Sequence, residues 1–263
     1  MLPSRPQRPT IVFVPGAWHA PSAYDLLLPP LHKAKYPTTY VYLASVGATA
    51  PVTLEDDVSA IRKVVAGLVI ELNREVVVVS HSYGATPTTE ALRGLGKKDR
   101  EGQKLSGGVV QLVYIAGIVP TNGVSCSEAF GPMKPKEEGG PWMEYNDLGD
   151  GFTSIKNAEE CFYHDIAPED AQYHASLLQR HYNPTGSSPL TYEAYKDIPA
   201  AFLYCEDDRA FPLESQERVV KAAGIQCTAS LKTSHSPFLS DPEGVVSFIR
   251  EVVEGPSRLC HIL

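Results

Sequence analysis

Four consecutive valines, residues 76–79, run directly into the pentapeptide Ser80-His81-Ser82-Tyr83-Gly84. An unbroken β-branched run is typical of a strand buried on both faces, as a central strand of a parallel sheet is. A helix-compatible stretch follows the pentapeptide. A strand that turns at once into a helix holds the residue at the turn, Ser82, in strained geometry with its hydroxyl projecting. Such a turn requires small residues two positions before and after, and Ser80, where glycine is usual, and Gly84 meet that requirement.

The rest of the chain alternates short β-branched runs with helical patterns, which favours an α/β fold: a mostly parallel sheet with helices on both faces. About six strands are expected, at residues 11–14, 40–43, 76–79, 109–115, 201–205 and 227–231. The clearest helices are expected at residues 53–72, where Thr53 to Asp56 fits a capping box, at 88–95, and from Asp241-Pro242 onward. With 263 residues and a hydrophobic share of 43%, the chain suits a single domain, residues 1–263.

Residues 120–197 break this alternation. The segment is rich in Gly, Pro, Tyr and acidic residues, and its one clear helical pattern runs from Pro168 to about Arg180. A structureless loop of that length is implausible inside a compact domain, so we expect a partly helical insertion packed over the core. The segment holds 13 acidic and 5 basic residues and 10 of the 23 aromatic residues, whereas the rest of the chain carries 18 charges of each sign.

A candidate nucleophile needs a base and an acid. A serine hydroxyl attacks a carbonyl only when a histidine takes its proton and a carboxylate orients that histidine. On a sheet of this kind the acid follows a late strand and the histidine lies in the last loop. His235 stands just before the last helix, and the fifth strand leads into Glu206-Asp207-Asp208. The usual spacing of four residues before a proline, here Pro212, favours Asp208, with Asp207 as the alternative.

Acyl transfer also requires two donors for the oxyanion. One is expected to be the backbone N–H of Tyr83, directly after the candidate nucleophile at a helix N-terminus. The other is expected from the loop after the first strand, where Gly16 permits a tight turn and Ala17 offers its N–H. Pro15 occupies the place of a frequent histidine, but the assigned donor does not depend on it.

Together, the motifs Phe13 to Trp18, Ser80 to Gly84, Glu206 to Pro212 and His235 to Phe238 resemble proteins of the α/β-hydrolase fold. The resemblance is closest to the single-domain esterase and hydroxynitrile lyase branch. It implies Ser82 as nucleophile, Asp208 as orienting acid, His235 as base, and residues 120–197 as a lid over the pocket. The Gly16 to His19 and Tyr204 to Pro212 runs look most like those of fungal hydrolases, some of which serve natural-product pathways.

Pocket residues are expected from adjacency to these groups. The candidates are Trp18 and His19 beside the oxyanion donor, Phe211 and Phe238 beside the acid and the base, and Trp142 and Tyr163 among the aromatic residues of the insertion. The other aromatic residues of the insertion that could line the pocket are Tyr145, Phe162, Tyr173, Tyr192 and Tyr195.

Several function classes are disfavoured. The net charge of −8, without a basic run, argues against a nucleic-acid partner. His164, His174 and His181 form no i, i+4 pair and lack a flanking carboxylate set, so no metal is expected, and Gly94-x-Gly96 lacks the third glycine of a nucleotide-binding loop. No cofactor is implied.

The longest apolar stretch, residues 109–119, is shorter than the ~20 residues of a membrane span, and the N-terminal residues lack a signal-peptide core. Five cysteines without a C-x-x-C spacing suggest reduced thiols and a cytoplasmic protein. The C-terminal run Cys260 to Leu263 fits a prenylation pattern, but no basic segment precedes it, so lipidation is the less favoured alternative.

We therefore expect a monomeric or homodimeric serine hydrolase that cleaves a carboxylic ester, thioester or lactone through an acyl-serine intermediate. The substrate is expected to be a small molecule, neutral and aromatic or polyketide-like, because the acidic insertion disfavours anions. Two alternatives stay open. One is a lyase or cyclase that uses the same three residues without an acyl-enzyme, and the other is a non-catalytic ligand receptor on the same scaffold.

Overall fold

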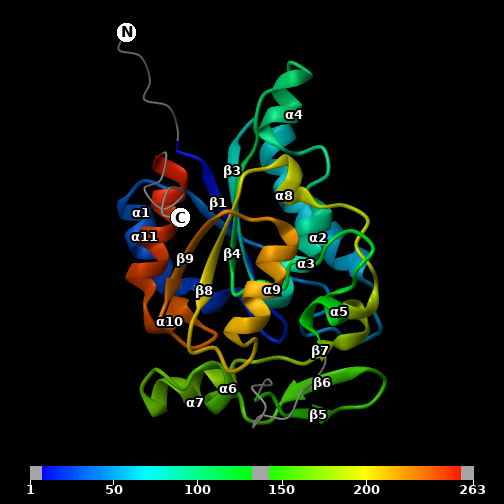
Figure 1. The fold of residues 1–263 in the computed structure, drawn as a ribbon, viewed down its shortest axis with the longest axis vertical. Helices are drawn as coiled ribbons and strands as arrows, with labels where there is room; N and C mark the ends of the chain where they lie inside the picture. The colour runs from blue at the N-terminus through cyan, green and yellow to red at the C-terminus, as the bar shows by residue number, and fades with distance from the viewer. Residues whose placement is uncertain (1–7, 132–141, 256–263) are drawn as a thin grey trace.

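The computed structural model of the protein describes residues 8–131 and 142–255. Its main sheet has six strands, all parallel, in the order β2-β1-β3-β4-β8-β9 (Figure 1). The strands are β1 (Thr10–Val14), β2 (Thr38–Tyr40), β3 (Glu75–His81), β4 (Gly108–Ile115), β8 (Ala200–Cys205) and β9 (Cys227–Leu231). The expected α/β fold with a parallel sheet of six strands is confirmed.

Helices cover both faces of the sheet (Figure 1). One face is covered by α2 (Leu54–Ala66), α3 (Ala85–Ala91), α8 (Ala194–Asp197) and α9 (Leu213–Ala223). The other is covered by a 3₁₀ helix (Pro21–Leu27), α1 (Leu28–Lys33), α10 (Pro237–Ser240) and α11 (Pro242–Glu254). A short helix, α4 (Lys97–Gly102), precedes β4.

The valine run of β3 shows how the two layers form. Val76 and Val78 belong to the hydrophobic cluster beneath α2 and α3, whereas Val77 and Val79 belong to the cluster beneath α1 and α11. All four are fully buried, because successive side chains of a strand point to opposite faces. Each buried valine contributes about 1.5–3 kcal/mol relative to an exposed one, so this strand anchors both cores.

Two expected helix starts are confirmed in atomic detail. At α2, the Asp56 amide donates to the Thr53 hydroxyl at 3.3 Å and the Thr53 amide donates to the Asp56 carboxylate at 2.7 Å, which completes the capping box. At α11, the Asp241 side chain accepts from the Gly244 amide at 2.8 Å. The expected helix 53–72 ends as an α-helix at Ala66 and continues as a π-helical turn, Gly67–Glu71.

Two expected elements are shifted. The strand expected at 40–43 lies at Thr38–Tyr40, because the chain leaves the sheet after Tyr40 and buries Val41 and Leu43 in the core instead. The helix expected at 88–95 is α3 (Ala85–Ala91). It starts earlier because its proline lies in the first turn, where a missing N–H has no cost.

Residues 120–197, called the excursion below, leave the sheet after β4 and return at β8. They include a second sheet of three antiparallel strands in the order β5-β6-β7. Its elements are α5 (Cys126–Phe130), β5 (Tyr145–Asp147), β6 (Phe152–Ile155), α6 (Ala158–Phe162), α7 (Pro168–Ser176), β7 (His181–Tyr182) and a 3₁₀ helix (Asn183–Ser187), followed by α8. Figure 1 shows β5, β6, α6 and α7 as a layer across one end of the main sheet. The helix expected from Pro168 to about Arg180 starts where predicted and ends at Ser176.

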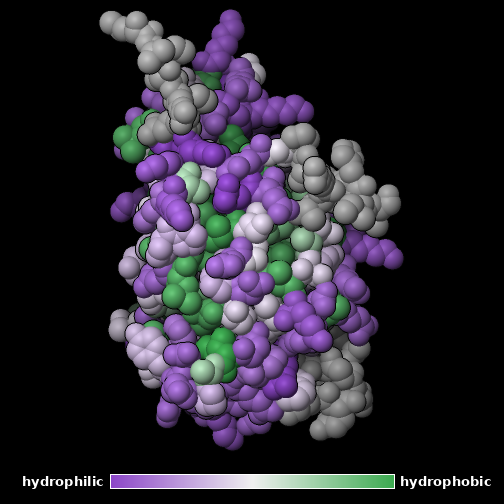
Figure 2. Space-filling model, turned by 90° about the vertical axis from the view of Figure 1, so that its left-hand side faces the viewer, coloured by the Kyte–Doolittle hydropathy of each residue, from purple (hydrophilic) through white to green (hydrophobic). Residues whose placement is uncertain are grey.

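The first and last described stretches meet at the opposite end of the molecule. Arg8 forms an ion pair with Glu254 of α11 at 3.0 Å, and the Tyr36 hydroxyl donates to the same carboxylate at 2.9 Å. Figure 2 shows the side that carries α1 and α11, where hydrophilic side chains dominate and hydrophobic ones gather in a central strip. No helix in residues 8–131 or 142–255 is long and apolar enough to cross a membrane. Cys260 and the N-terminal seven residues lie outside the described residues.

Candidate active site

The turn after β3 has the geometry that the sequence predicts for a nucleophile. Ser82 has a φ of +51°, a left-handed conformation that costs a non-glycine residue of the order of 1–3 kcal/mol. A Cβ on Gly84 would lie 2.2 Å from the carbonyl oxygen of Pro15, so only glycine fits there. Ser80 is fully buried, and its small side chain is accommodated where glycine is usual. The turn therefore packs directly against the loop after β1.

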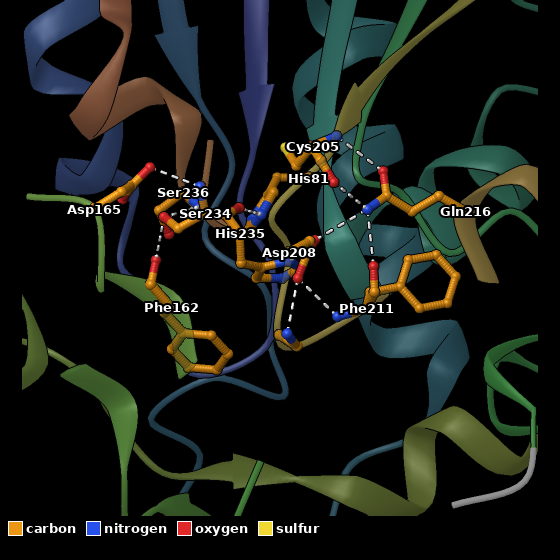
Figure 3. A network of polar contacts seen from close by, with 11 residues as sticks. His81, Phe162, Asp165, Cys205, Asp208, Phe211, Gln216, Ser234, His235 and Ser236 are labelled. Carbon is orange, nitrogen blue, oxygen red and sulfur yellow. Dashed lines mark hydrogen bonds and ion pairs between the residues drawn. The ribbon is translucent and has the colours of Figure 1, made fainter. Parts of the chain in front are cut away.

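The acid and the histidine lie side by side in the loops after β8 and β9. His235 Nδ1 is 2.6 Å from Asp208 Oδ2, and both side chains are buried (Figure 3). The second carboxylate oxygen of Asp208 accepts the amides of Ala210 and Phe211, each at 2.8 Å. Asp207 is exposed to solvent. The structure therefore brings Asp208, and not Asp207, to the histidine.

Gln216 of α9 supports this carboxylate, and sequence reasoning missed it. Its side-chain amide donates to Asp208 Oδ2 at 3.3 Å and to the carbonyls of Cys205 and Phe211 at 3.0 and 2.8 Å (Figure 3). Its Oε1 accepts the Cys205 amide at 3.0 Å. A signal was available, because Gln216 is the polar member of the buried stripe that continues with Val219 and Val220.

His81, at the end of β3, contacts the backbone of His235. Its Nε2 lies 2.8 Å from the carbonyl oxygen of His235, and because a carbonyl only accepts, Nε2 carries the proton. The two imidazole rings are 4.5 Å apart. Burial lowers the pKa of His81 well below its usual value, so this ring is neutral beside His235.

The excursion contacts the histidine loop directly. The Ser234 amide donates to Asp165 at 2.6 Å, and the Ser234 hydroxyl donates to the carbonyl of Phe162 at 2.8 Å (Figure 3). The Phe162 ring lies 5.5 Å from the ring of His235. The loop that carries His235 is therefore held by contacts from the excursion as well as from the sheet.

The loop after β1 contributes a second buried histidine. His19 Nδ1 lies 2.8 Å from the carbonyl oxygen of Ala17, and the Tyr163 hydroxyl lies 2.9 Å from His19 Nε2. The carbonyl must accept, so Nδ1 carries the proton and Nε2 accepts from the tyrosine. Burial lowers the pKa of His19 to about 4, so the ring is neutral near neutral pH.

These loops surround a cavity of about 330 Å³. Ser82, His235 and the two expected oxyanion donors, Ala17 and Tyr83, lie on its wall. Most of the remaining wall is apolar or aromatic, including Trp18, Ile118, Met143, Tyr145, Phe162 and Phe211. Among the described residues, the wall contains no Asp, Glu, Lys or Arg. The side chain of Tyr83 is not wholly apolar in its contacts, since its hydroxyl donates to the buried Asp57 at 2.7 Å.

Of the six expected pocket residues, Trp18, His19 and Phe211 line the cavity. The expectation for Phe238 is wrong. This side chain is fully buried in the cluster beneath α1 and α11, with its ring 4.9 Å from that of Tyr24 and 5.0 Å from that of His81. Adjacency to His235 was misleading because α10 turns the chain back toward the core.

Trp142 and Tyr163 are not among the residues that line the cavity, contrary to the expectation. The Arg209 guanidinium lies over the Trp142 ring at 4.2 Å, and the Tyr163 hydroxyl bonds to His19, which itself lines the cavity. Tyr145 and Phe162, two of the other aromatic candidates of the excursion, do line the cavity. His181, considered above only as a metal ligand, also lines the cavity. Nowhere in the described residues do three His, Cys, Asp or Glu side chains gather as a metal ion would require.

Comparisons with known proteins agree with this fold. The model of the alpha/beta hydrolase family matches residues 11–248. The chain is 34% identical over 248 residues to the alpha/beta hydrolase nvfD of Aspergillus novofumigatus, an alignment that covers 92% of this chain and 96% of that protein. It is 29% identical over 255 residues to the probable hydrolase R7 of a Phoma species, over 93% and 98% of the two chains.

Among solved structures, polyneuridine aldehyde esterase matches with a TM-score of 0.74 at 18% identity, over 94% of this chain and 99% of that chain. At this identity the likeness concerns the fold. The family model, however, spans nearly all of the described core, and the Aspergillus relative is similar over almost its whole length. The chain therefore belongs to the alpha/beta hydrolase family.

Proposed function

We propose that the protein is a serine hydrolase that cleaves a carboxylic ester, thioester or lactone of a small uncharged substrate. The observation that carries the proposal is the buried contact of 2.6 Å between Asp208 and His235, because His235 lies with Ser82 on the wall of one cavity. A strained serine, a histidine and a buried carboxylate in these roles are the components that acyl transfer requires.

The reaction follows from the positions of the donors and acceptors. His235 donates from Nδ1 to Asp208, which leaves Nε2 to take the proton of Ser82 as the serine oxygen attacks the substrate carbonyl. The backbone N–H groups of Ala17 and Tyr83 stabilise the oxyanion. His235 then protonates the departing alcohol or thiol. A water molecule, deprotonated by His235, attacks the acyl-Ser82 carbonyl, and release of the acid restores the serine.

The cavity wall supports an uncharged, aromatic substrate. Burying a charge against a wall without a charged partner is costly, and aromatic side chains favour flat apolar groups. The excursion, which we propose acts as a lid over this cavity, carries a net charge of −8 in sequence. That charge disfavours the approach of anionic substrates.

Covalent labelling tests the mechanism. A fluorophosphonate probe should add one label to the wild-type protein, seen by intact mass, as the Ser82 oxygen bonds to phosphorus and fluoride leaves. Ser82→Ala should remove both the label and any hydrolysis of p-nitrophenyl acetate.

Asp208 and its neighbour Asp207 provide a test variant and a matched control for the role of the acid. Asp208→Asn should slow ester turnover by about 10⁴-fold, the loss typical of a triad whose histidine takes the wrong tautomer. Asp207→Asn should leave turnover within about twofold, as is usual for exposed positions away from the chemistry. Equal rates in the two variants would refute the assignment of Asp208.

The substrate class has a separate test. A neutral aryl ester should have a higher kcat/KM than its carboxylated analogue. Added salt should reduce this difference in kcat/KM, because it screens the negative charge of the excursion. Equal or better turnover of the carboxylated ester would refute the uncharged class. Labelling of Ser82 without hydrolysis of any ester would favour the lyase or cyclase alternative. The absence of both labelling and turnover would favour a receptor.

A further inference from the structure

Trp18, next to the expected oxyanion donor, has an unusual backbone conformation. The His19 amide donates to the Gly16 carbonyl at 3.3 Å, which closes a β-turn over residues 16–19. Trp18 is the third residue of this turn and has a φ of +64°. That position favours glycine when φ is positive, and a bulky side chain there is rare. Something outside the turn must therefore keep Trp18 in this conformation.

The conformation matters because of the peptide that precedes it. The Gly16 carbonyl and the Ala17 N–H belong to one planar peptide unit and point in opposite directions. When the His19 amide holds the Gly16 oxygen, it also sets the direction of the Ala17 N–H. If Trp18 left the left-handed region, the turn would open and the Ala17 N–H would rotate away from the oxyanion position.

The excursion supplies the contacts that hold Trp18. The indole Nε1 donates to the Thr153 hydroxyl of β6 at 3.2 Å, and the Gln179 amide donates to the Trp18 carbonyl at 2.8 Å. The Thr153 hydroxyl in turn donates to Asn183 Oδ1 at 2.8 Å, so its lone pair faces the indole. The ring of Trp18 also packs against that of Tyr145, with centroids 5.7 Å apart.

We propose that Trp18 is a positioning residue that aims the Ala17 N–H at the oxyanion, and that Thr153 and Gln179 of the excursion maintain its strained turn. The inference rests on the proposed function, since it assigns a role to a residue that acts through the oxyanion donor. It follows that the oxyanion site is complete only while β6 is in place against the loop after β1.

Two variants break this link without emptying the cavity wall. Thr153→Val removes the acceptor and keeps the shape of the side chain, whereas Trp18→Phe removes the indole donor and keeps an aromatic ring. Ser154→Ala is the matched control. Ser154 is the next residue of β6, so its side chain points to the opposite side of the strand, where it bonds to Asn146.

The readouts are the rate of Ser82 labelling by a fluorophosphonate, whose phosphoryl oxygen occupies the oxyanion site, and kcat and KM for p-nitrophenyl acetate. Loss of one oxyanion donor typically costs 10²–10³ in rate, so misdirecting it should cost roughly tenfold in labelling rate and kcat. KM should stay within about twofold, because the donor acts on the transition state. The double variant should be no slower than the slower single one, and Ser154→Ala should match the wild type.

The outcomes separate the two proposals. If the wild type is not labelled and hydrolyses no ester, the proposed function fails and this inference falls with it. If the wild type is labelled, and Thr153→Val and Trp18→Phe react at wild-type rates, the proposed function stands and the role of Trp18 is refuted. A rise in KM without a fall in kcat would also refute it, since that pattern indicates a mere wall contact. If one variant fails to fold, the other carries the same test.

Discussion

Lowering the pH should destabilise this protein through a histidine that folding keeps neutral. His19 is 4% exposed, its Nδ1 proton is held by the Ala17 carbonyl and its Nε2 is occupied by the Tyr163 hydroxyl. A second proton on the ring would place a positive charge in the core. Burial accordingly lowers the pKa of His19 from 6.5 to about 4.

The sign and the size follow from proton linkage. Below its ordinary pKa of 6.5 the unfolded chain binds a proton at His19 that the native protein does not bind. The free energy of unfolding therefore falls as the pH drops, until the native ring also protonates near pH 4. Across that interval the loss amounts to about 3 kcal/mol, since each tenfold change in proton affinity is worth ~1.4 kcal/mol. That is a large part of the ~5–15 kcal/mol that stabilises a typical domain.

Urea denaturation of the wild type, His19→Gln and Tyr163→Phe between about pH 7 and about pH 4.5 would measure this effect. His19→Gln should lose about 2–3 kcal/mol less than the wild type over that range, because the glutamine does not titrate. Tyr163→Phe should be less stable at every pH but keep the wild-type slope, since it retains the buried imidazole. Parallel curves for the wild type and His19→Gln would refute the reasoning.

Three further predictions concern positions around the site and at a helix end. Gly84→Ala should lower the free energy of unfolding by more than ~2 kcal/mol and abolish fluorophosphonate labelling, because its Cβ would lie 2.2 Å from a carbonyl oxygen. Gly67→Ala, whose Cβ would have nothing within 4 Å, should raise the free energy of unfolding by up to ~1 kcal/mol. Normal labelling of Gly84→Ala would show that the turn tolerates a side chain. Gln216→Leu should cost about 2–4 kcal/mol in urea denaturation and slow labelling, because it leaves buried groups around Asp208 without a partner, and unchanged stability would count against that network. Thr53→Ala should lower the free energy of unfolding by ~1 kcal/mol through loss of the capping box, with turnover unaffected; a change in turnover would mean that the helix start is linked to the site.

The sequence predicts those parts of the fold in which residue type or short spacing along the chain determines which groups are buried or bonded. The valine run of β3 is buried on both faces, so its apolarity is continuous and easily recognised. The spacing of Asp208 from Pro212 predicts the carboxylate that the structure brings to His235, because backbone amides at fixed distances along the same loop hold it. The start of α11 is equally local, since Asp241 caps a helix three residues away.

The remaining features depend on contacts between distant parts of the chain. The strands β5 and β6 carry no buried alternation, and Tyr145 to Asp147 is exposed, so nothing in their sequence distinguishes them from loop. Trp18 looks like one more pocket residue until the contacts with Thr153 and Gln179, well over a hundred residues away, are known. Adjacency to His235 places Phe238 in the pocket wrongly for the same reason, because the direction of a side chain after a turn is set by the partners that surround it.

The ion pair between Arg8 and Glu254 holds two positions near the beginning and the end of the described chain next to each other. A short peptide could bridge these two positions, and the chain could then be opened at the exposed β5–β6 turn around Gly149 instead. Such a circular permutant would keep every parallel pairing of the main sheet and would place both new ends in the β5–β6 hairpin, where β6 stays paired with β7. Residues of β5 could then be varied from the new end, and variants selected for new substrates, while Thr153 and Gln179 keep their contacts with Trp18 and the order of the core strands is unchanged.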